Sequence, residues 1–272
     1  MQAGYYQATG GMVTQFNRLD VVSNNLANLN TTGYKRQDVV IGDFMQILTG
    51  MQDDLPYNNH TKEASSFINR TLDRVPQVVQ EYTTFDMGSI VKTGNPLDVA
   101  IKAEDTFLAV QTPAGIKYTK AGSLSVNDAG DLIPKDGSIV ISKTYKNDQQ
   151  PIKISQDAQD IAIDTQGSIS LRLAGTTTPE TAGQNALFRF ENPQALKRIG
   201  SNLYEATQPP LEVENEGSLM QGYIEKSNVN PDNEMVALIE VNRLVGMYQK
   251  VMDTQMNDMN SDAINKLASI KV

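Results

Sequence analysis

The stretch from Asn24 to Lys35, which reads NNLANLNTTGYK, decides how the rest of this chain can fold. Four asparagines lie within seven residues of one another. An asparagine amide competes with the helix for backbone hydrogen bonds, so asparagine favours helix ends and turns. Gly33 can adopt the positive φ that a helix exit needs. The stretch therefore predicts the end of an N-terminal helix and a bend into another structure.

The residues before this stretch predict an amphipathic helix from about residue 3 to about residue 29. Larger or apolar side chains recur every three or four residues, and the opposite face is polar. Gly10 and Gly11 each weaken a helix by about 1 kcal/mol relative to alanine, so this helix needs a packing partner. The apolar stripe comprises Tyr5, Ala8, Met12, Phe16, Leu19, Val22 and Leu26, and the polar face comprises Gln7, Thr14, Gln15, Asn17 and Arg18.

A second helix is predicted from Pro231 to the end of the chain. Asn230 has the chemistry of an N-cap, and Pro231 suits the first helical position. Beyond them, apolar side chains alternate three and four residues apart, close to a heptad seam, and Asn257–Asp262 is the weak point where fraying or a bend is expected. The seam consists of Leu238, Val241, Val245, Tyr248, Met252, Met256, Met259, Ala263, Leu267 and Ile270.

The middle of the chain predicts short antiparallel strands, because the apolar period becomes two from Ser89 onward. Turn sequences such as Asn127–Gly130 and Thr165–Gly167 separate these strands. The middle strands are expected at residues 97–101, 107–110, 116–118, 124–126, 139–141, 152–154, 161–163, 169–171, 186–191 and 203–206, with a tight turn at 192–193. Further strands are expected at 39–41, at 77–82 and within 218–225, and loops at 53–60 and 176–180.

These elements predict an α+β chain with three parts. The N- and C-terminal helices, residues 1–33 and 229–272, are expected to pair as a coiled-coil-like domain. Residues 34–87 and 206–228 form a connecting β-rich joint, and residues 88–205 form an antiparallel all-β middle domain.

The composition excludes several classes of protein. The 272-residue chain has a formal charge of −9, so non-specific attraction to nucleic acid or to an anionic membrane surface is not expected. It contains no cysteine, which excludes disulfides and cysteine zinc sites. Neither a membrane-spanning apolar run nor a cleavable signal sequence is recognisable, so we expect a soluble protein that is cytoplasmic or exported without a cleaved peptide.

The sequence offers few parts for an active site. His60 is the only histidine and lies among loop residues, so we expect it to be solvated rather than a base or a metal ligand. Glu104 with Asp105, or Asp128 with Asp131, could act as paired carboxylates, but the second pair fits a hairpin turn better. We therefore predict no enzymatic activity, no cofactor and no metal site.

Four motifs give the chain a resemblance to a known family. Asn24–Asn28 with Thr32–Lys35 resembles an N-terminal NNLAN signature followed by a T-x-G-aromatic-Lys exit. Gln221–Asn230 resembles a C-terminal Q-G-x-L-E-x-S-N-V entry into the last helix, and Thr93–Ile101 and Tyr118–Ser123 resemble two stretches of the same family's β domain. With both ends and the middle covered, the chain is similar to the flagellar basal-body rod and hook proteins of bacteria.

This resemblance implies a non-enzymatic subunit of the flagellar rod, the drive shaft of the motor. The terminal helices are then expected to form an inner coiled-coil layer around an export channel, with the β domain outside. The implied partners are copies of the chain itself, other rod proteins and the flagellar export apparatus, with no nucleic acid and no membrane insertion. The implied location is the periplasmic rod of the basal body, reached without a cleaved signal peptide.

Two departures from the family pattern favour a proximal-rod over a distal-rod protein. Asp105–Leu108 replaces the family's usual Gly-Phe-Phe, and residues 45–87 lack the glycine-rich additional segment of distal-rod proteins. The length of 272 residues fits either kind.

The interfaces between subunits are expected to combine the two helical stripes with the motif residues. The expected interface residues are Met12, Phe16, Leu19, Val22, Asn24, Asn25, Leu26, Asn28, Gly33, Tyr34, Asn228, Asn230, Met235, Leu238, Val241, Val245, Tyr248, Met252, Met256 and Met259. One alternative stays open at this point: a β-domain binding module, for a glycan or a protein, carried on a helical oligomerising stalk.

Overall fold

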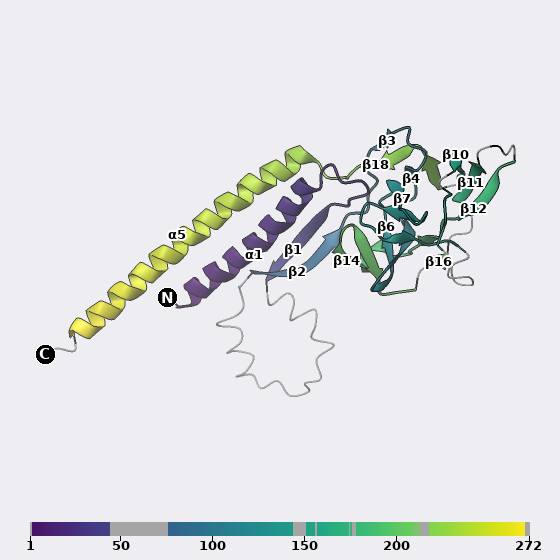
Figure 1. Ribbon diagram of the computed structural model, residues 1–272. Helices are drawn as coiled ribbons and strands as arrows, with labels where there is room; N and C mark the ends of the chain where they lie inside the picture. Colours follow the sequence, from purple (N-terminus) through teal and green to yellow (C-terminus); the bar gives the residue numbers. More distant parts are fainter. Residues whose placement is uncertain are drawn as a thin grey trace, which may run out of the picture. The chain divides into compact units, whose positions relative to one another are not determined.

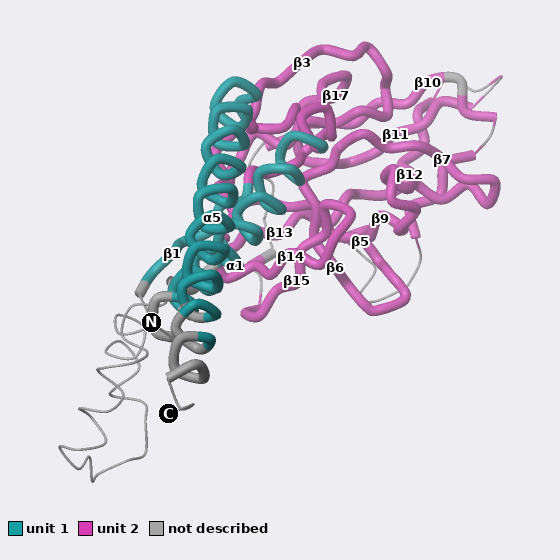
Figure 2. The backbone as a smooth tube through the Cα atoms, turned by 90° about the vertical axis from the view of Figure 1, so that its left-hand side faces the viewer, with its two compact units in different colours: residues 1–27, 37–82, 230–272 teal, residues 28–36, 83–229 magenta. Residues whose placement is uncertain are grey.

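The computed structural model describes residues 2–43, 76–143, 151–155, 157–173, 175, 178–209, 211–212 and 218–269. The chain divides into two compact units, which Figure 2 colours separately. Unit 1 comprises residues 1–27, 37–82 and 230–272, and unit 2 comprises residues 28–36 and 83–229, so the chain passes between them at four peptide bonds. The α+β class is confirmed, and the division into three domains stays a prediction.

Unit 1 contains two long helices and a two-stranded sheet. Helix α1 spans Gln2–Ala27 and helix α5 spans Pro231–Ser269, and the two lie side by side (Figure 1). Strands β1 (Gln37–Asp43) and β2 (Pro76–Thr83) pair with each other. These strands confirm the predictions at 39–41 and 77–82, whereas the loop predicted at 53–60 lies outside the described residues.

The asparagine-rich stretch ends α1 earlier than predicted. The helix ends at Ala27, two residues before the expected end. Asn28 starts a turn in place of another helical turn, because its backbone oxygen accepts a hydrogen bond from Thr31 N at 3.1 Å and its Oδ1 accepts one from Thr31 Oγ1 at 3.0 Å. Gly33 then adopts a φ of +67°, which confirms its predicted conformation.

Helix α5 begins at the predicted residues. Oδ1 of Asn230 accepts hydrogen bonds from the backbone N–H of Asp232 at 3.0 Å and of Asn233 at 3.3 Å, which is N-cap geometry. The helix runs for 39 residues and continues through Asn257–Asp262, so the fraying predicted there is wrong. Asparagine and aspartate cost only about 0.7 kcal/mol or less each in a helix interior, which a long helix tolerates.

Helices α1 and α5 are antiparallel, and two contacts define their register. Near the end of α1, Asn25 Nδ2 donates to Glu234 Oε2 in the first turn of α5 at 3.2 Å. Near the start of α1, Gly11 lies against the ring of Tyr248. At about 1.5 Å of rise per residue, the longer α5 extends past the first residues of α1, as Figure 1 shows.

The buried face of α1 overlaps the predicted stripe only in part, since Ala8 and Val22 are buried as predicted. Thr14 and Gln15 are buried, so their predicted place on the polar exposed face is wrong, and Phe16 is 39% exposed. The reason lies at Gly11, where an added Cβ would stand 2.5 Å from Cε1 of Tyr248, because α5 approaches α1 at its small residues. On α5 the predicted seam residues Val241 and Val245 are buried. The helices contact each other along this seam, and supercoiling stays a prediction.

Unit 2 consists mostly of short antiparallel strands in several small sheets. Within the described residues, its largest sheet has the order β14-β15-β6-β5-β13-β16, with β9 paired beside β5. A second sheet has the order β10-β11-β12, and pairs form between β17 and β4, β18 and β3, and β7 and β8. Their bounds are β3 Ile90–Lys92, β4 Val99–Ile101, β5 Thr106–Thr112, β6 Gly115–Thr119, β7 Leu124–Val126, β8 Leu132–Pro134, β9 Ile139–Val140, β10 Ala158–Ile163, β11 Ser168–Leu173, β12 Glu180–Gln184, β13 Leu187–Arg189, β14 Leu196–Gly200, β15 Leu203–Ala206, β16 Leu211–Glu212, β17 Leu219–Gln221 and β18 Tyr223–Glu225.

Three of the predicted middle elements are corrected by the structure. Residues 152–154 form no strand, because Pro151 and Lys153 make only isolated bridges to two different partners. Of the loop predicted at 176–180, residues 176 and 177 lie outside the described part of the chain, and Glu180 belongs to β12. Gly222, with a φ of +76°, splits the single strand predicted within 218–225 into β17 and β18. The predicted tight turn is present as a 3-10 turn at Pro193–Ala195.

Two clusters of buried side chains form the core of unit 2. The first is aliphatic and includes Val110, Leu132, Val140, Ile152 and Ile169, each at most 1% exposed. The second is aromatic, with ring centroids of Phe85, Phe107, Tyr118, Phe190 and Tyr204 between 4.9 and 5.8 Å apart in their contacting pairs. Full burial of one large apolar side chain contributes about 1.5–3 kcal/mol, so unit 2 has a substantial core of its own.

A matched pair of glycine substitutions tests the helix seam. Gly11→Val should displace the Tyr248 ring and loosen the contact between α1 and α5, because its side chain would overlap that ring. Gly246→Val places the same side chain in open space on α5 and should leave the pair intact. Hydrogen exchange of the α1 backbone amides should therefore accelerate in Gly11→Val alone. Equal exchange in both variants would contradict the seam.

Candidate functional site

The helix pair of unit 1 carries exposed apolar side chains on both helices. On α1, Val13 is 54% exposed and Phe16 is 39% exposed. On α5, Val236 is 66% exposed and Ile239 is 69% exposed. We call the full set the outer apolar residues: Val13, Phe16, Met235, Val236, Ile239, Met247, Val251, Met256 and Ile264. Exposed apolar side chains gathered on one element are typical of surfaces that are covered in an assembly.

The residues predicted at interfaces are found in three places: buried or partly buried within unit 1, exposed on unit 1, and in unit 2. Val22, Asn25, Val241 and Val245 are buried, and Met12, Leu19, Leu26, Leu238, Tyr248 and Met252 are partly buried. Phe16, Asn24, Asn230, Met235 and Met256 are exposed, and the side chain of Met259 lies outside the described part. Asn28, Gly33, Tyr34 and Asn228 belong to unit 2.

Asn25 links three elements of unit 1. Its Oδ1 accepts a hydrogen bond from Gln37 N at 3.1 Å, and its Nδ2 donates to Gln37 O at 2.8 Å. The same Nδ2 donates to Glu234 Oε2 at 3.2 Å. Asn25 and Glu234 are 0% and 1% exposed. One amide therefore joins α1, the first residue of β1 and the first turn of α5.

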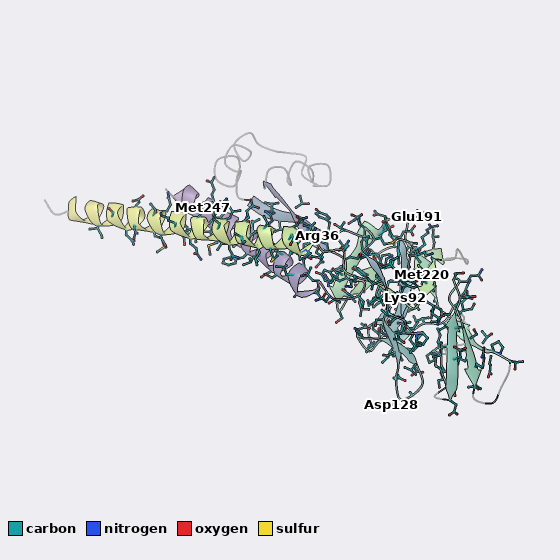
Figure 3. All side chains as sticks on the ribbon, turned by 90° about the horizontal axis from the view of Figure 1, so that it is seen from above. Arg36, Lys92, Asp128, Glu191, Met220 and Met247 are labelled. Carbon is teal, nitrogen blue, oxygen red and sulfur yellow. The ribbon has the colours of Figure 1, made fainter. Side chains whose placement is uncertain are left out.

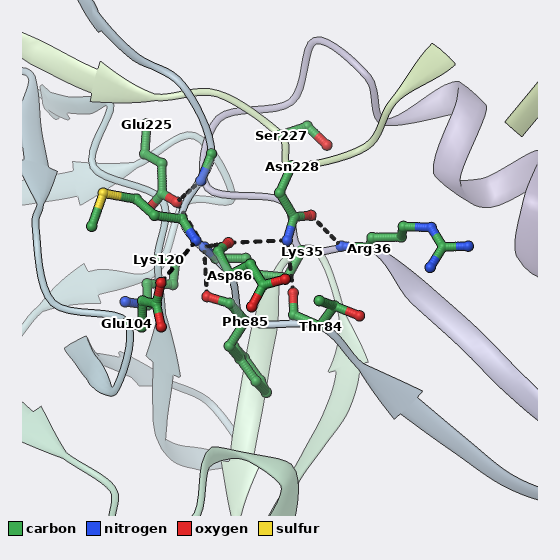
Figure 4. A network of polar contacts seen from close by, with 12 residues as sticks. Lys35, Arg36, Thr84, Phe85, Asp86, Glu104, Lys120, Glu225, Ser227 and Asn228 are labelled. Atoms are coloured by element: carbon green, nitrogen blue, oxygen red, sulfur yellow. Dashed lines mark hydrogen bonds and ion pairs between the residues drawn. The ribbon is translucent and has the colours of Figure 1, made fainter. Parts of the chain in front are cut away.

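In unit 2, a buried ion pair joins the segment after α1 to the strand before α5. Lys35 Nζ lies 2.6 Å from Glu225 Oε1, and both side chains are nearly fully buried (Figure 4). The same ammonium donates to the backbone oxygens of Phe85 at 3.2 Å and Asp86 at 2.8 Å. Gly33 N adds a main-chain hydrogen bond to Glu225 O at 2.9 Å. We call this network the joint.

Asn228 adds a second set of hydrogen bonds to the joint. Its Nδ2 donates to Thr84 O at 2.8 Å and to Asp86 O at 3.0 Å. Its Oδ1 accepts a hydrogen bond from Arg36 N at 2.7 Å (Figure 4). A single amide therefore holds the segments on either side of β1 and β2 beside the segment that leads to α5.

Gly33 and Tyr34 complete the joint by close packing. A Cβ on Gly33 would overlap the backbone of Lys120, and its φ of +67° favours glycine independently of space. The ring of Tyr34 is fully buried, with Cζ of Arg198 4.3 Å from its centroid. Asn202 Nδ2 donates to Thr32 O at 3.1 Å, so the turn after β14 also holds this segment.

Lys120 places a second buried ammonium next to the first. It is 2% exposed, donates to Ala103 O and lies 4.8 Å from the centroid of the Phe107 ring. Burial and, after it, the nearby charge of Lys35 together lower the pKa of Lys120 from 10.5 to about 7, against the opposite effect of Glu225. The joint thus holds two lysines around one buried carboxylate.

Sequence reasoning did not select these three charged residues. Lys35, Lys120 and Glu225 each stand inside a motif that the sequence showed, but only their apolar, glycine and asparagine neighbours were predicted as site residues. Their burial depends on contacts between segments as far as 190 residues apart, which no local pattern records.

The carboxylates considered for catalysis have structural partners. Asp105 Oδ2 lies 2.6 Å from Arg189 Nε, and Glu104 Oε1 accepts a hydrogen bond from Met87 N at 3.3 Å. Asp128 and Asp131 lie in the turn of the β7–β8 hairpin, which confirms the hairpin interpretation. Among the residues that the structure describes, no group of three acidic or histidine side chains is placed to hold a metal ion. His60 lies outside them.

Within the same described part of the chain, neither long helix has an apolar segment of the length and hydropathy needed to cross a bilayer.

Three protein families match separate segments of the chain. Residues 6–35 match the family described as "Flagella basal body rod protein", and residues 100–171 match "Flagellar hook protein FlgE/F/G D1 domain". Residues 220–267 match "Flagellar basal body rod FlgEFG protein C-terminal". Each segment contains one charged residue of the joint, namely Lys35, Lys120 and Glu225 respectively.

Whole-length relatives agree with these families. The chain is 34% identical over 264 residues to the flagellar basal-body rod protein FlgG of Caulobacter vibrioides, covering 91% of this chain and 93% of the relative. It is 32% identical to FlgG of Agrobacterium fabrum, with the same shares covered. It is 28% identical to FlgG of Bacillus subtilis over the full length of both chains.

Removing the carboxylate of the joint should destabilise unit 2. Glu225→Gln leaves the buried ammonium of Lys35 without a counter-charge, and breaking a buried pair in this way costs about 3–5 kcal/mol. Asp160→Asn is the matched control, because Asp160 pairs with Arg172 at 3.6 Å where both side chains are more than half exposed, so its loss should matter little. Urea unfolding followed by circular dichroism measures both. A wild-type midpoint in Glu225→Gln would refute the role of the pair.

The stability of unit 2 should rise with pH above neutrality. Between the folded pKa of Lys120, about 7, and its unfolded value of 10.5, the unfolded chain binds a proton that the folded chain does not. The free energy of unfolding therefore increases with pH between these two values. Below about pH 7 Lys120 is charged in both states, so the folded chain bears the full free-energy cost of burying that charge. Each unit of pKa shift is worth about 1.4 kcal/mol.

The variant Lys120→Met should remove this pH dependence. It should melt at a higher temperature than wild type at pH 7 and show a flatter profile up to pH 10, while Lys102→Met, an exposed control in the same unit, should follow the wild type. If the melting temperature of Lys120→Met rises with pH as steeply as that of the wild type, the pH dependence belongs to another group.

Proposed function

Because the chain belongs to the family of flagellar basal-body rod proteins, we propose that it builds the rod by helical self-assembly through its two terminal helices. It is a structural component of the flagellar rod and not an enzyme, and its place is the basal body. The proposal concerns how the subunits join, and it rests on the surface of unit 1.

The outer apolar residues are the observation that carries this proposal. Seven of them lie on α5, where Val236 and Ile239 are about two-thirds exposed at 66% and 69%. Met256 and Ile264, nearer the C-terminal end of α5, are 48% and 65% exposed. Burying such side chains favours association by roughly 25 cal/mol for each Å² of apolar surface removed from water. A second copy of the same helix pair offers matching apolar surface.

The helix pair of unit 1 buries several polar side chains. Thr14, Gln15, Asn25 and Glu234 are buried there alongside Val22, Val241 and Val245. Among the described residues, Oε1 of Gln15 is buried and accepts no hydrogen bond, and such a group costs about 1–3 kcal/mol. Contacts with neighbouring subunits would stabilise the folded helices by mass action.

The joint supports a mechanical role for unit 2. Thr32, Arg36, Thr84 and Asn228 stand close in sequence to the four peptide bonds at which the chain leaves this unit, and all four make hydrogen bonds within the joint. A force applied to any of these segments therefore acts on the joint, which lies in the same unit as the aliphatic and aromatic cores. We propose that this network lets the subunit transmit torque without local unfolding.

Partners and location follow from the family. We propose that the chain assembles with copies of itself and with other rod proteins, lines the export channel with its helices and passes through the flagellar export apparatus to the periplasmic rod. The proximal rather than distal position along the rod stays a prediction. The proposed contact surface consists of the outer apolar residues and those predicted interface residues of the two helices that are not buried within the subunit.

A charge placed on the outer surface of α5 should block assembly. Ile239→Lys removes an apolar contact, and the new ammonium group cannot be buried between subunits without a large desolvation cost. The folding of unit 2 should be unchanged. Ile116→Lys is the matched control, because Ile116 is also exposed, at 45%, but lies on β6 of unit 2. Sedimentation and electron microscopy of the purified chain, with motility of cells that carry each variant, give the readout.

Two outcomes would contradict the proposal. Wild-type assembly and motility in Ile239→Lys would remove α5 from the interface. A small closed oligomer of the purified chain, with both termini protected from protease at micromolar concentration, would favour the binding module on a stalk instead.

A further inference from the structure

Methionines make up a large part of the exposed surface of α5. Three of the seven exposed large apolar side chains on this helix are Met235, Met247 and Met256, at 48%, 50% and 48% exposure. Met247 is labelled on α5 in Figure 3. Leucine would also supply an apolar contact, and its helix propensity is about equal to that of methionine. Methionine differs from leucine in its flexible, unbranched side chain and in its reactive thioether.

The composition makes methionine the main side chain of this chain that can react with mild oxidants. The chain has eleven methionines but neither cysteine nor tryptophan, so thioethers are its only sulfur groups. Two-electron oxidants such as hydrogen peroxide or hypochlorous acid convert an accessible thioether to a sulfoxide. Susceptibility follows exposure, so the methionines on the outside of α5 should react before those inside the seam.

We propose that Met235, Met247 and Met256 form an oxidation site through which peroxide-class oxidants block incorporation of the free subunit. The sulfur lone pair attacks one oxygen of the peroxide, the S–O bond forms as the O–O bond breaks, and the other oxygen leaves as water after proton transfer. Sulfur loses two electrons and the peroxide gains them. An apolar side chain thereby becomes a strongly polar one.

The consequence rests on the proposed function, since it requires that the outer surface of α5 be buried between subunits. A sulfoxide carries a strong hydrogen-bond acceptor, which costs free energy when buried without a donor. Three such groups on one helix would turn a contact that drives assembly into one that opposes it. Subunits already built into the rod would have these thioethers covered, so the free subunit is the sensitive state.

The helix pair and unit 2 supply internal controls. Met252 lies in the seam, where it is partly buried and Thr9 Oγ1 lies 3.5 Å from its Sδ, so it should react more slowly. Met87 is 41% exposed but belongs to unit 2, so its sulfoxide should form readily without affecting assembly. Met→Leu substitutions keep apolar volume and helix propensity while removing the thioether.

The test treats the purified full-length chain with hydrogen peroxide. Mass spectrometry of peptides then reports sulfoxide at each methionine, and sedimentation reports assembly. We expect Met235, Met247, Met256 and Met87 to oxidise several-fold faster than Met252. We also expect the treated wild type to lose most of its sedimenting fraction. The triple variant M235L/M247L/M256L should keep that fraction after the same treatment, whereas M87L should lose it as the wild type does.

The outcomes separate this inference from the proposed function. An untreated chain that fails to assemble counts against self-assembly, while the order of oxidation still tests the site. Oxidation of Met252 as fast as that of Met235, Met247 and Met256 would overturn the site. Equal loss of assembly in the treated triple variant and the treated wild type would overturn its link to assembly, and so would full assembly of an oxidised wild type.

Discussion

The buried ion pair between Lys35 and Glu225 is the interaction on which the arrangement of unit 2 depends. It joins two segments 190 residues apart in the chain, and neither side chain can exchange its partner for water. Around it, the backbone oxygens of Phe85 and Asp86 accept hydrogen bonds from Lys35 Nζ, and Gly88 N donates one to Glu225 Oε1 at 2.7 Å. A buried charge pair is costly unless it is surrounded in this way. The segments leading out of unit 2 are therefore held by one network that tolerates little displacement.

Lys120 shows that this network is not optimised for stability alone. Its ammonium is buried beside that of Lys35, so two positive charges share one carboxylate at the cost of a strongly lowered pKa for Lys120. Part of that cost is offset by the Phe107 ring and the backbone oxygen of Ala103. The three charged residues come from three separately matched segments of the flagellar families. A polar joint of this kind specifies one way of bringing those segments together.

The two units differ in where their stability originates. Unit 2 has aliphatic and aromatic cores of its own, whereas unit 1 buries polar side chains beside a few valines and leaves many of its large apolar side chains exposed. A subunit made in this way can be folded in one part and dependent on neighbours in the other. That division suits a rod component, because association then completes the helices instead of covering an already stable surface.

The sequence by itself determined the α+β class, both helices, the N-cap at Asn230, the turn at Gly33 and many of the strands, because those features follow from local spacing and turn chemistry. It also carried the motifs of the flagellar family. Only the tertiary structure decided that Thr14 and Gln15 are buried and that Phe16 is not, because burial on α1 depends on how α5 and β1 pack against it. It alone buried Lys35, Lys120 and Glu225 together, since the burial of a charge depends on partners distant in the chain.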